Sequence, residues 1–151
     1  MKGKSCFFIG RREASEKLLP ALLEAVETHI TKYGVREFVV GHYGEFDRLA
    51  AIAVKKAKQQ HPEITLLMLL PYHPAERPVE MPKGFDDTYY PPGMEKVPRS
   101  LAIVRANRYM VDHVDYLISY VWHEISNAHE LTAYPELREN KGLIKVTHIE
   151  K

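Results

Sequence analysis

Short apolar runs alternate with longer amphipathic stretches along the chain, and most of the runs end beside a glycine, a proline or a histidine. The runs cover residues 6–9, 37–40, 65–70, 116–121 and 143–146. Because they are apolar almost throughout, without a polar residue at every second position, they predict strands buried on both faces. Such strands are typical of a parallel sheet.

Helical periodicity separates these predicted strands. Apolar residues recur with a 3.6-residue period in residues 18–30, 47–60, 98–113 and 127–139. Pro20 is compatible with the first helix if it opens it, whereas Pro135 disturbs the last. The alternation predicts an α/β fold, with a doubly wound parallel sheet of about five strands, helices on both faces and right-handed crossovers. We expect a single domain over residues 1–151.

One stretch, residues 71–98, interrupts the alternation. It carries seven of the ten prolines, together with Tyr72, Phe85, Tyr89 and Tyr90. A loop this long inside a compact domain is usually functional or mobile, and disordered segments are poor in aromatic residues. We interpret it as an ordered flap beside a ligand site. The alternative is a proline-stiffened surface excursion packed by its own aromatics.

Composition and charge narrow the classes of function. Lys and Arg number 21 and Asp and Glu 20, so a net charge of +1 gives no electrostatic reason to expect nucleic-acid binding. The single cysteine, Cys6, lies in a predicted strand and cannot form an internal disulfide, which fits a reducing compartment. No apolar run approaches the ~18 residues of a membrane span, and no signal peptide is evident. We expect a cytoplasmic protein without membrane association.

Glycines and polar side chains follow the predicted strands. In open parallel sheets, ligands bind at the carboxyl ends of the strands, near the point where strand order reverses. The polar helix that precedes the fourth strand adds two arginines and an asparagine able to grip an anion. The candidate ligand-binding residues are Gly10, Arg11, Arg12, Gly41, His42, Gly44, Asp47, Asn107, Arg108, Ser126 and Asn127.

The turn after the second strand illustrates the two interpretations of these residues. Gly41 and Gly44 let the backbone approach a ligand closely, and the helix opened by Asp47 directs free N–H groups at an anion. The spacing matches neither a dinucleotide fingerprint nor a P-loop. Alternatively, both glycines form a tight turn and Asp47 caps the helix.

A second anion site is predicted where the last helix begins. Ser126 or Asn127 would accept the first helical N–H groups, and Asn127 with Glu130 has the spacing of a capping box. Capping alone would also explain these residues. Glu130 is the one carboxylate that we nominate as a general acid or base.

Several histidines would lie near the same sheet edge. They lack the spacing of a zinc motif, and no Cys or Asp joins them as a ligand set, so we expect no metal and no other cofactor. These histidines are His42, His73, His123 and His129.

Three segments resemble the SLOG superfamily, which is named for the Smf/DprA and LONELY GUY proteins, and in particular a small bacterial branch of it. Phe8-Ile-Gly-Arg-Arg12 resembles the opening strand of that branch, and Gly44-Glu-Phe-Asp-Arg-Leu-Ala-Ala51 resembles its Gly-x-Asp-x-x-Ala-Ala segment with one extra residue. Arg105-Ala-Asn-Arg-Tyr-Met-Val-Asp112 is similar to its Arg-Asn-x-x-Met-Val-Asp block, again with one residue interposed.

The resemblance implies a Rossmann-like fold that binds nucleotides or nucleotide-derived ligands at the strand ends. Enzymatic relatives cleave the N-glycosidic bond of a nucleoside monophosphate, using an arginine and a glutamate. By position, Arg105 or Arg108 would be that arginine and Glu130 that glutamate. The phosphate loop of those enzymes is Pro-Gly-Gly-x-Gly-Thr, whereas residues 121–127 of this chain contain no glycine.

Two functions follow from these observations. We favour a nucleotide-binding or sensing module, and the alternative is a phosphoribohydrolase-like enzyme. We also expect a homodimer, because relatives of the superfamily commonly dimerise. Tyr89, Tyr90, Tyr109 and Met110 would approach the surface, where aromatics and methionine favour interfaces.

Overall fold

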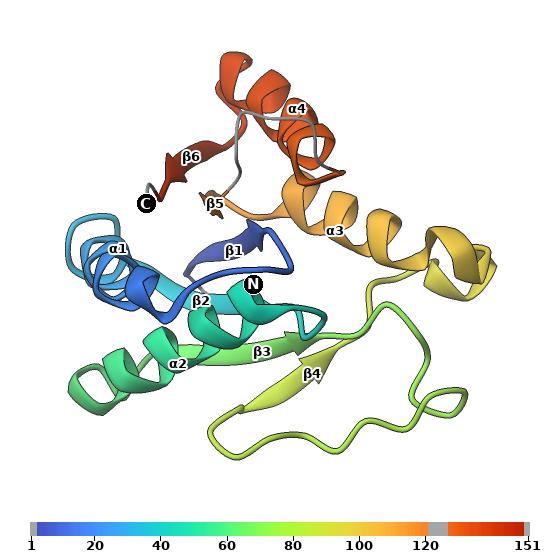
Figure 1. Ribbon diagram of the computed structural model, residues 1–151, viewed down its shortest axis with the longest axis horizontal. Coiled ribbons are helices and arrows are strands. Elements are labelled where there is room, and N and C mark those ends of the chain that lie inside the picture. The colour runs from blue at the N-terminus through green and yellow to red at the C-terminus, as the bar shows by residue number, and fades with distance from the viewer. Residues whose placement is uncertain (1–2, 121–126, 150–151) are drawn as a thin grey trace.

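The computed structural model describes residues 3–120 and 127–149, and its centre is one parallel sheet of six strands in the order β4-β3-β2-β1-β5-β6 (Figure 1). Every neighbouring pair of strands is parallel. The doubly wound α/β prediction is therefore confirmed. The strands are β1 (Lys4–Gly10), β2 (Val35–Val40), β3 (Thr65–Leu69), β4 (Asp87–Tyr89), β5 (Tyr116–Tyr120) and β6 (Lys145–His148).

Four helices connect the strands, and the described helices include none long and apolar enough to cross a membrane. A left-handed glycine, Gly34, separates the first helix from β2, and Pro20 lies in that helix's first turn, where its missing N–H costs nothing. The helices are α1 (Leu19–Thr31), α2 (Glu45–Gln60), α3 (Ala102–His113) and α4 (Asn127–Asn140), with short 3-10 turns η1 (Glu16–Leu18), η2 (Met94–Lys96) and η3 (Arg99–Leu101).

The two faces of the sheet carry separate cores. Adjacent residues of β1 show the division, because Phe8 packs into the core under α1 and α2 while Phe7 packs into the core under α3. Successive side chains of a strand point to opposite faces, so each apolar strand serves both cores. Tyr134 of α4 packs against the α3 core. The helices α1 and α2 thus cover one face, and α3 and α4 the other (Figure 1).

The expected number of strands was wrong, because the proline-rich segment contributes β4 at the edge of the sheet. Leu67, Met68 and Leu69 of β3 pair with Asp87, Thr88 and Tyr89. Asp86 supports this pairing, since its carboxylate accepts the Leu66 N–H at 2.8 Å. Three residues are too few to show a strand pattern, and their conformation follows from pairing with β3.

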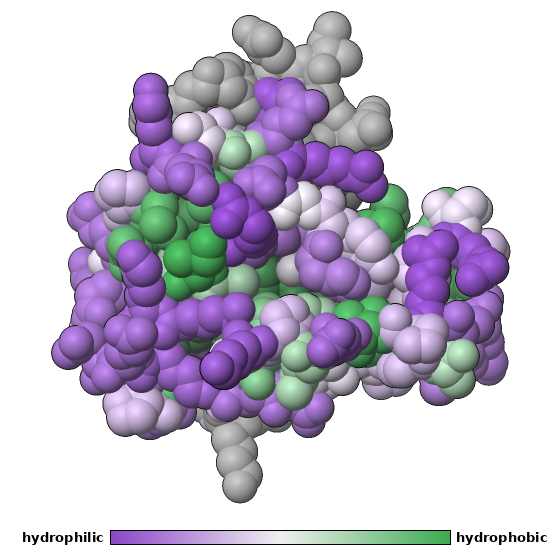
Figure 2. Space-filling view, turned by 60° about the horizontal axis from the view of Figure 1, so that its bottom comes forward, coloured by the Kyte–Doolittle hydropathy of each residue, from purple (hydrophilic) through white to green (hydrophobic). Residues whose placement is uncertain are grey.

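Two further expectations need correction. The last strand begins at Lys145, two residues later than predicted, because left-handed Gly142 and exposed Leu143 still belong to the preceding turn. Met110 does not approach the surface: it is only 1% exposed and belongs to the core under α3. On the face drawn in Figure 2, apolar surface is divided into patches among hydrophilic residues.

Candidate functional site

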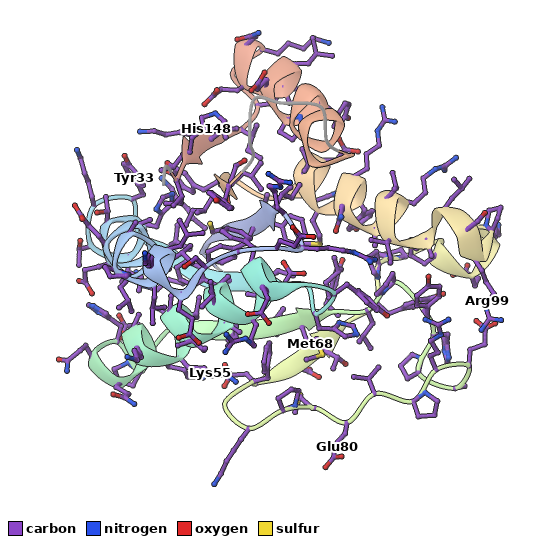
Figure 3. All side chains as sticks on the ribbon, in the orientation of Figure 1. Tyr33, Lys55, Met68, Glu80, Arg99 and His148 are labelled. Atoms are coloured by element: carbon purple, nitrogen blue, oxygen red, sulfur yellow. The ribbon has the colours of Figure 1, made fainter. Side chains whose placement is uncertain are left out.

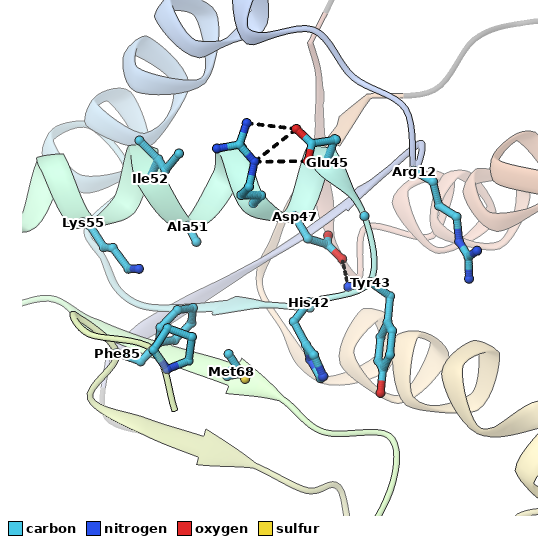
Figure 4. Close-up of a pocket in the computed structure, with 14 residues that line it drawn as sticks. Arg12, His42, Tyr43, Glu45, Asp47, Ala51, Ile52, Lys55, Met68 and Phe85 are labelled. Carbon is cyan, nitrogen blue, oxygen red and sulfur yellow. Dashed lines mark hydrogen bonds and ion pairs between the residues drawn. The ribbon is translucent and has the colours of Figure 1, made fainter. Parts of the chain in front are cut away.

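A cavity of about 580 Å³ opens beside the carboxyl end of β2, between α2 and the loop that leads to β4 (Figure 4). This is the edge of the sheet at which ligands of parallel α/β folds bind. Lys55 of α2 and Met68 of β3, labelled in Figure 3, both line this cavity on the α2 side of the sheet. The cavity is lined by Arg12, Gly41, His42, Tyr43, Gly44, Glu45, Asp47, Arg48, Ala51, Ile52, Lys55, Met68, Pro82 and Phe85.

Gly44 joins two loops at the rim of this cavity. The Glu45 N–H donates to the carbonyl of Arg12 at 2.7 Å, so the loop after β1 lies directly against the turn after β2. A Cβ on Gly44 would lie 2.8 Å from the Arg12 Cα, closer than real Cβ contacts allow. Gly44 is therefore required by the approach of the chain's own backbone, and that approach sets the Arg12 side chain at the cavity rim.

Asp47 secures the same turn from the opposite side. Asp47 is the third residue of α2, and its carboxylate reaches back and accepts the N–H of Tyr43, the residue before the N-cap Gly44, at 3.2 Å. A Cβ on Gly41 would lie 2.8 Å from the Asp47 Oδ2, so the carboxylate occupies the space above that glycine. The expectation that Asp47 opens and caps the helix was therefore wrong, because α2 begins at Glu45 and no side chain caps it at Gly44. Asp47 holds the turn before the helix instead, and it also lines the cavity.

The polar end of the cavity holds two titratable groups with shifted pKa values. Burial raises the pKa of Asp47 to about 6, against the opposing effect of its bond to the Tyr43 N–H. Burial lowers the pKa of His42, partly offset by a hydrogen bond with the Leu69 backbone. The His42 Nδ1 is buried and has no partner in the described part of the chain. The centroids of the His42 and Tyr43 rings lie 4.2 Å apart and the rings are tilted by 35°, so two adjoining polar rings line this end of the cavity.

The opposite end of the cavity is apolar. Ile52 of α2 and Met68 of β3 line it together with Pro82 and Phe85 of the proline-rich segment. Lys55 Nζ lies 4.8 Å from the centroid of the Phe85 ring, which positions a cation at this end. The proline-rich segment thus forms one wall of the cavity.

Two cations lie at opposite ends of the cavity, Arg12 beside the start of α2 and Lys55 one helical turn beyond Ala51 (Figure 4). Arg48 is already paired with Glu45 at 2.9 Å and with Glu16 at 3.1 Å. Arg12 and Lys55 form no ion pair within residues 3–120 and 127–149 as described. These two side chains are therefore the ones available to a bound anion.

Asn107 and Arg108 lie elsewhere, on the α3 face of the sheet. They line a smaller cavity of about 120 Å³ with Ile9 and Tyr134. The Arg108 guanidinium carbon lies 4.2 Å from the centroid of the Tyr134 ring, so it stacks on α4. Arg108 and Gly41 were both predicted to bind the ligand, but they border different cavities, because α2 and α3 cover opposite faces of the sheet.

Three further residues predicted to belong to the site do not line the large cavity. A Cβ on Gly10 would lie 2.3 Å from the Phe46 ring, so this glycine admits a core side chain. The Arg11 N–H donates to the Tyr120 carbonyl at 3.2 Å and extends the pairing of β1 with β5. Arg105 borders a third cavity, of about 270 Å³, with Arg108 and Asp112.

The second predicted anion site falls largely outside the described residues. Ser126 and His123 lie outside them. Asn127 begins α4 and Glu130 lies in its first turns, as expected, but their side chains are outside the described part. In that part, no group of three or more His, Cys, Asp or Glu residues could hold a metal ion.

Sequence reasoning missed part of the lining. Lys55 was not among the predicted ligand-binding residues, and Phe85 was identified only as an aromatic residue of the flap. Ile52 and Met68 gave no signal beyond their apolar character. No protein-family model matches the chain, and no curated protein matches it either. We therefore base the functional assignment on the geometry of the cavity.

Proposed function

We propose that this chain binds a nucleotide or a nucleotide-derived ligand in the cavity between α2 and the flap. The supporting observation is the division of one cavity into an apolar end and a polar, cationic end. A nucleotide has the matching division, with a flat base at one end and an anionic phosphate at the other. The resemblance of the loops after β1 and β2 to the SLOG superfamily supports the same class of ligand.

The base is assigned to the apolar end, between Ile52 on α2 and the Met68 and Phe85 side chains across the cavity. Phe85 could stack on the base, because every base presents a flat aromatic face to such a side chain. Lys55, which lies above the Phe85 ring, adds a cation beside a bound base.

The phosphate is assigned to the rim formed by Arg12 and the first turn of α2. No side chain caps this helix at Gly44, and its first N–H, that of Glu45, is bound by the Arg12 carbonyl. The next N–H groups, those of Phe46 and Asp47, are left for an anion at the positive end of the helix dipole. Arg12 supplies a charge-assisted bond to phosphate. Asp47 is assigned to the sugar, because an ionised carboxylate accepts hydrogen bonds from hydroxyl groups.

The alternative function is cleavage of the N-glycosidic bond of a nucleoside monophosphate. One observation favours it: Arg108 stacks on Tyr134 of α4, the helix that also carries Glu130. The arginine and the glutamate of the proposed reaction therefore belong to adjacent helices. We prefer binding, because the larger cavity brings together residues suited to a base and to a phosphate, and neither Arg108 nor Glu130 is among its lining residues.

A thermal-shift screen of nucleotides, nucleotide sugars and ADP-ribose derivatives tests the proposal. A ligand at 100 times its dissociation constant adds roughly 2.7 kcal/mol to the unfolding free energy. Arg12→Ala should weaken binding of a hit on the order of tenfold or more, since a charge-assisted bond contributes about 1.5–3 kcal/mol. Lys55→Ala should also weaken it, whereas the exposed neighbour Lys56→Ala should not.

Unchanged affinity in both Arg12→Ala and Lys55→Ala would refute the site. The enzymatic alternative has a separate readout, which is release of free base from a nucleoside monophosphate. Base release by the wild type that disappears in Glu130→Gln would replace binding with catalysis as the function.

A further inference from the structure

A fourth cavity, of about 260 Å³, lies on the α3 face of the sheet, opposite the proposed nucleotide site. It is bounded by β2, by β4 and by the second half of α3. Glu37 and Val39 reach it because they alternate along β2 with Phe38 and Val40, which face α2. Its lining residues are Glu37, Val39, Tyr89, Tyr109, Met110 and His113.

Glu37 is an unusual residue for this position. It is half-buried on the interior of a strand, and burial raises its pKa. Its carboxylate makes no ion pair or hydrogen bond with another side chain in the described part of the chain. A carboxyl group withdrawn from water without a partner destabilises a fold. A ligand of opposite charge would supply the partner that the described residues do not.

Three rings form the wall around this carboxyl group. The Tyr89 and Tyr109 hydroxyls lie 3.3 Å apart, and the His113 ring stacks on Tyr109 with centroids 3.9 Å apart. The His113 Nδ1 lies 2.7 Å from the Tyr109 carbonyl, which fixes the orientation of the histidine. The rings are thus held in place before any ligand arrives. The faces of aromatic rings attract cations.

We propose that this cavity binds a small organic cation, a primary amine or a guanidine, with its charge against Glu37 and its carbon chain against Val39, Met110 and the tyrosine rings. The volume equals that of about nine water molecules, which suits a short-chain amine. This site is independent of the nucleotide site, since the two have no lining residue in common.

Calorimetric titration with putrescine and agmatine tests the proposal, with butanol as a neutral probe and butyrate as an anionic one. We expect both cations to bind and neither control probe to do so. Glu37→Gln preserves the shape of the side chain and should weaken cation binding on the order of tenfold or more. Glu24→Gln, at an exposed position of α1, should leave binding unchanged. Equal affinity in Glu37→Gln and wild type would overturn the proposal, as would the absence of cation binding at millimolar concentration.

Two further measurements complete the test. In an NMR titration of the wild type, putrescine should shift the ring resonances of Tyr89, Tyr109 and His113. Shifts confined to other residues would overturn the site even if Glu37→Gln failed to fold. The same cationic group can be carried by a lysine side chain, so a short lysine-containing peptide is the third arm. Tighter binding of the peptide than of either free cation would replace a small-molecule site with a peptide-docking site.

Discussion

Replacing Asp47 with asparagine should stabilise this protein above pH 6. Asparagine keeps the size of the side chain and an oxygen that can accept the Tyr43 N–H, but it carries no charge. Folding raises the pKa of Asp47 from 3.8 to about 6. A carboxyl group with a raised folded-state pKa contributes its stability below the unfolded pKa, and that stability is lost as the pH rises through 6.

The size of the effect follows from the shift. About two pKa units correspond to about 3 kcal/mol, and this is an upper value because the residue as a whole is partly exposed. The unfolding free energy of Asp47→Asn, relative to the wild type, should therefore increase by up to about 3 kcal/mol between pH 4 and pH 8.

Chemical denaturation of both proteins across this pH range measures the difference. Asp87→Asn, at an exposed position of β4, is the control for loss of one negative charge. A difference that stays constant from pH 4 to pH 8 would show that the Asp47 carboxyl group is as well solvated in the folded protein as in the unfolded chain. A confirmed gain would mean that the natural residue costs stability at the wall of the cavity, as functional groups often do.

Three other predictions follow from the structure. Gly44→Ala should lower the unfolding free energy by about 1–3 kcal/mol, because its Cβ would meet the backbone of the loop after β1. In the control Gly93→Ala the Cβ would meet no atom, so the substitution should cost only the strain of a left-handed backbone, about 1 kcal/mol. Denaturant titration of the two variants compares these costs. Phe85→Ala should weaken nucleotide binding by about 1–3 kcal/mol, measured by calorimetry, and unaltered affinity would remove the flap from the site. We expect light scattering to show a homodimer with Leu101 and Val104 in its interface, because these apolar side chains are 43% and 51% exposed. Val104→Glu should then yield the 17.4 kDa monomer. A wild type that is already monomeric at micromolar concentration would contradict this prediction.

The sequence predicted the long elements well, because each has its own periodicity. Continuous apolar runs identified five strands, and the 3.6-residue pattern identified all four helices. The edge strand β4 could not be found in this way, since Asp87, Thr88 and Tyr89 have no apolar pattern and become a strand only by pairing with β3. The late start of β6 has a similar cause, because Leu143 is apolar but exposed.

The large cavity lies at the edge of the sheet where the sequence predicted a ligand site, but the sequence did not predict which face of the sheet it is on. Residues that follow parallel strands lie at the same edge of the sheet, whichever face the helices cover. Arg12, Gly41 and Gly44 therefore lie together at the cavity. Arg108 and Asn107 were assigned to the same pocket because a helix approaches that edge too. Which face a helix covers depends on the handedness and order of the crossovers, and a one-dimensional pattern does not contain that information.

The turn after β2 also shows why structural and functional interpretations of a motif need not compete. Gly41 and Gly44 are required by neighbouring protein atoms, and the Asp47 carboxylate holds the Tyr43 N–H, so the fold alone explains all three. That bond uses only the Asp47 Oδ2, while Oδ1 accepts no hydrogen bond from the described residues. The bond therefore fixes the carboxyl group at the cavity wall and leaves one of its oxygens for a ligand. An asparagine could hold the same N–H without a titratable group. The difference between the two residues is testable, since Asp47→Asn should preserve folding and lose whatever the charge of Asp47 contributes to binding.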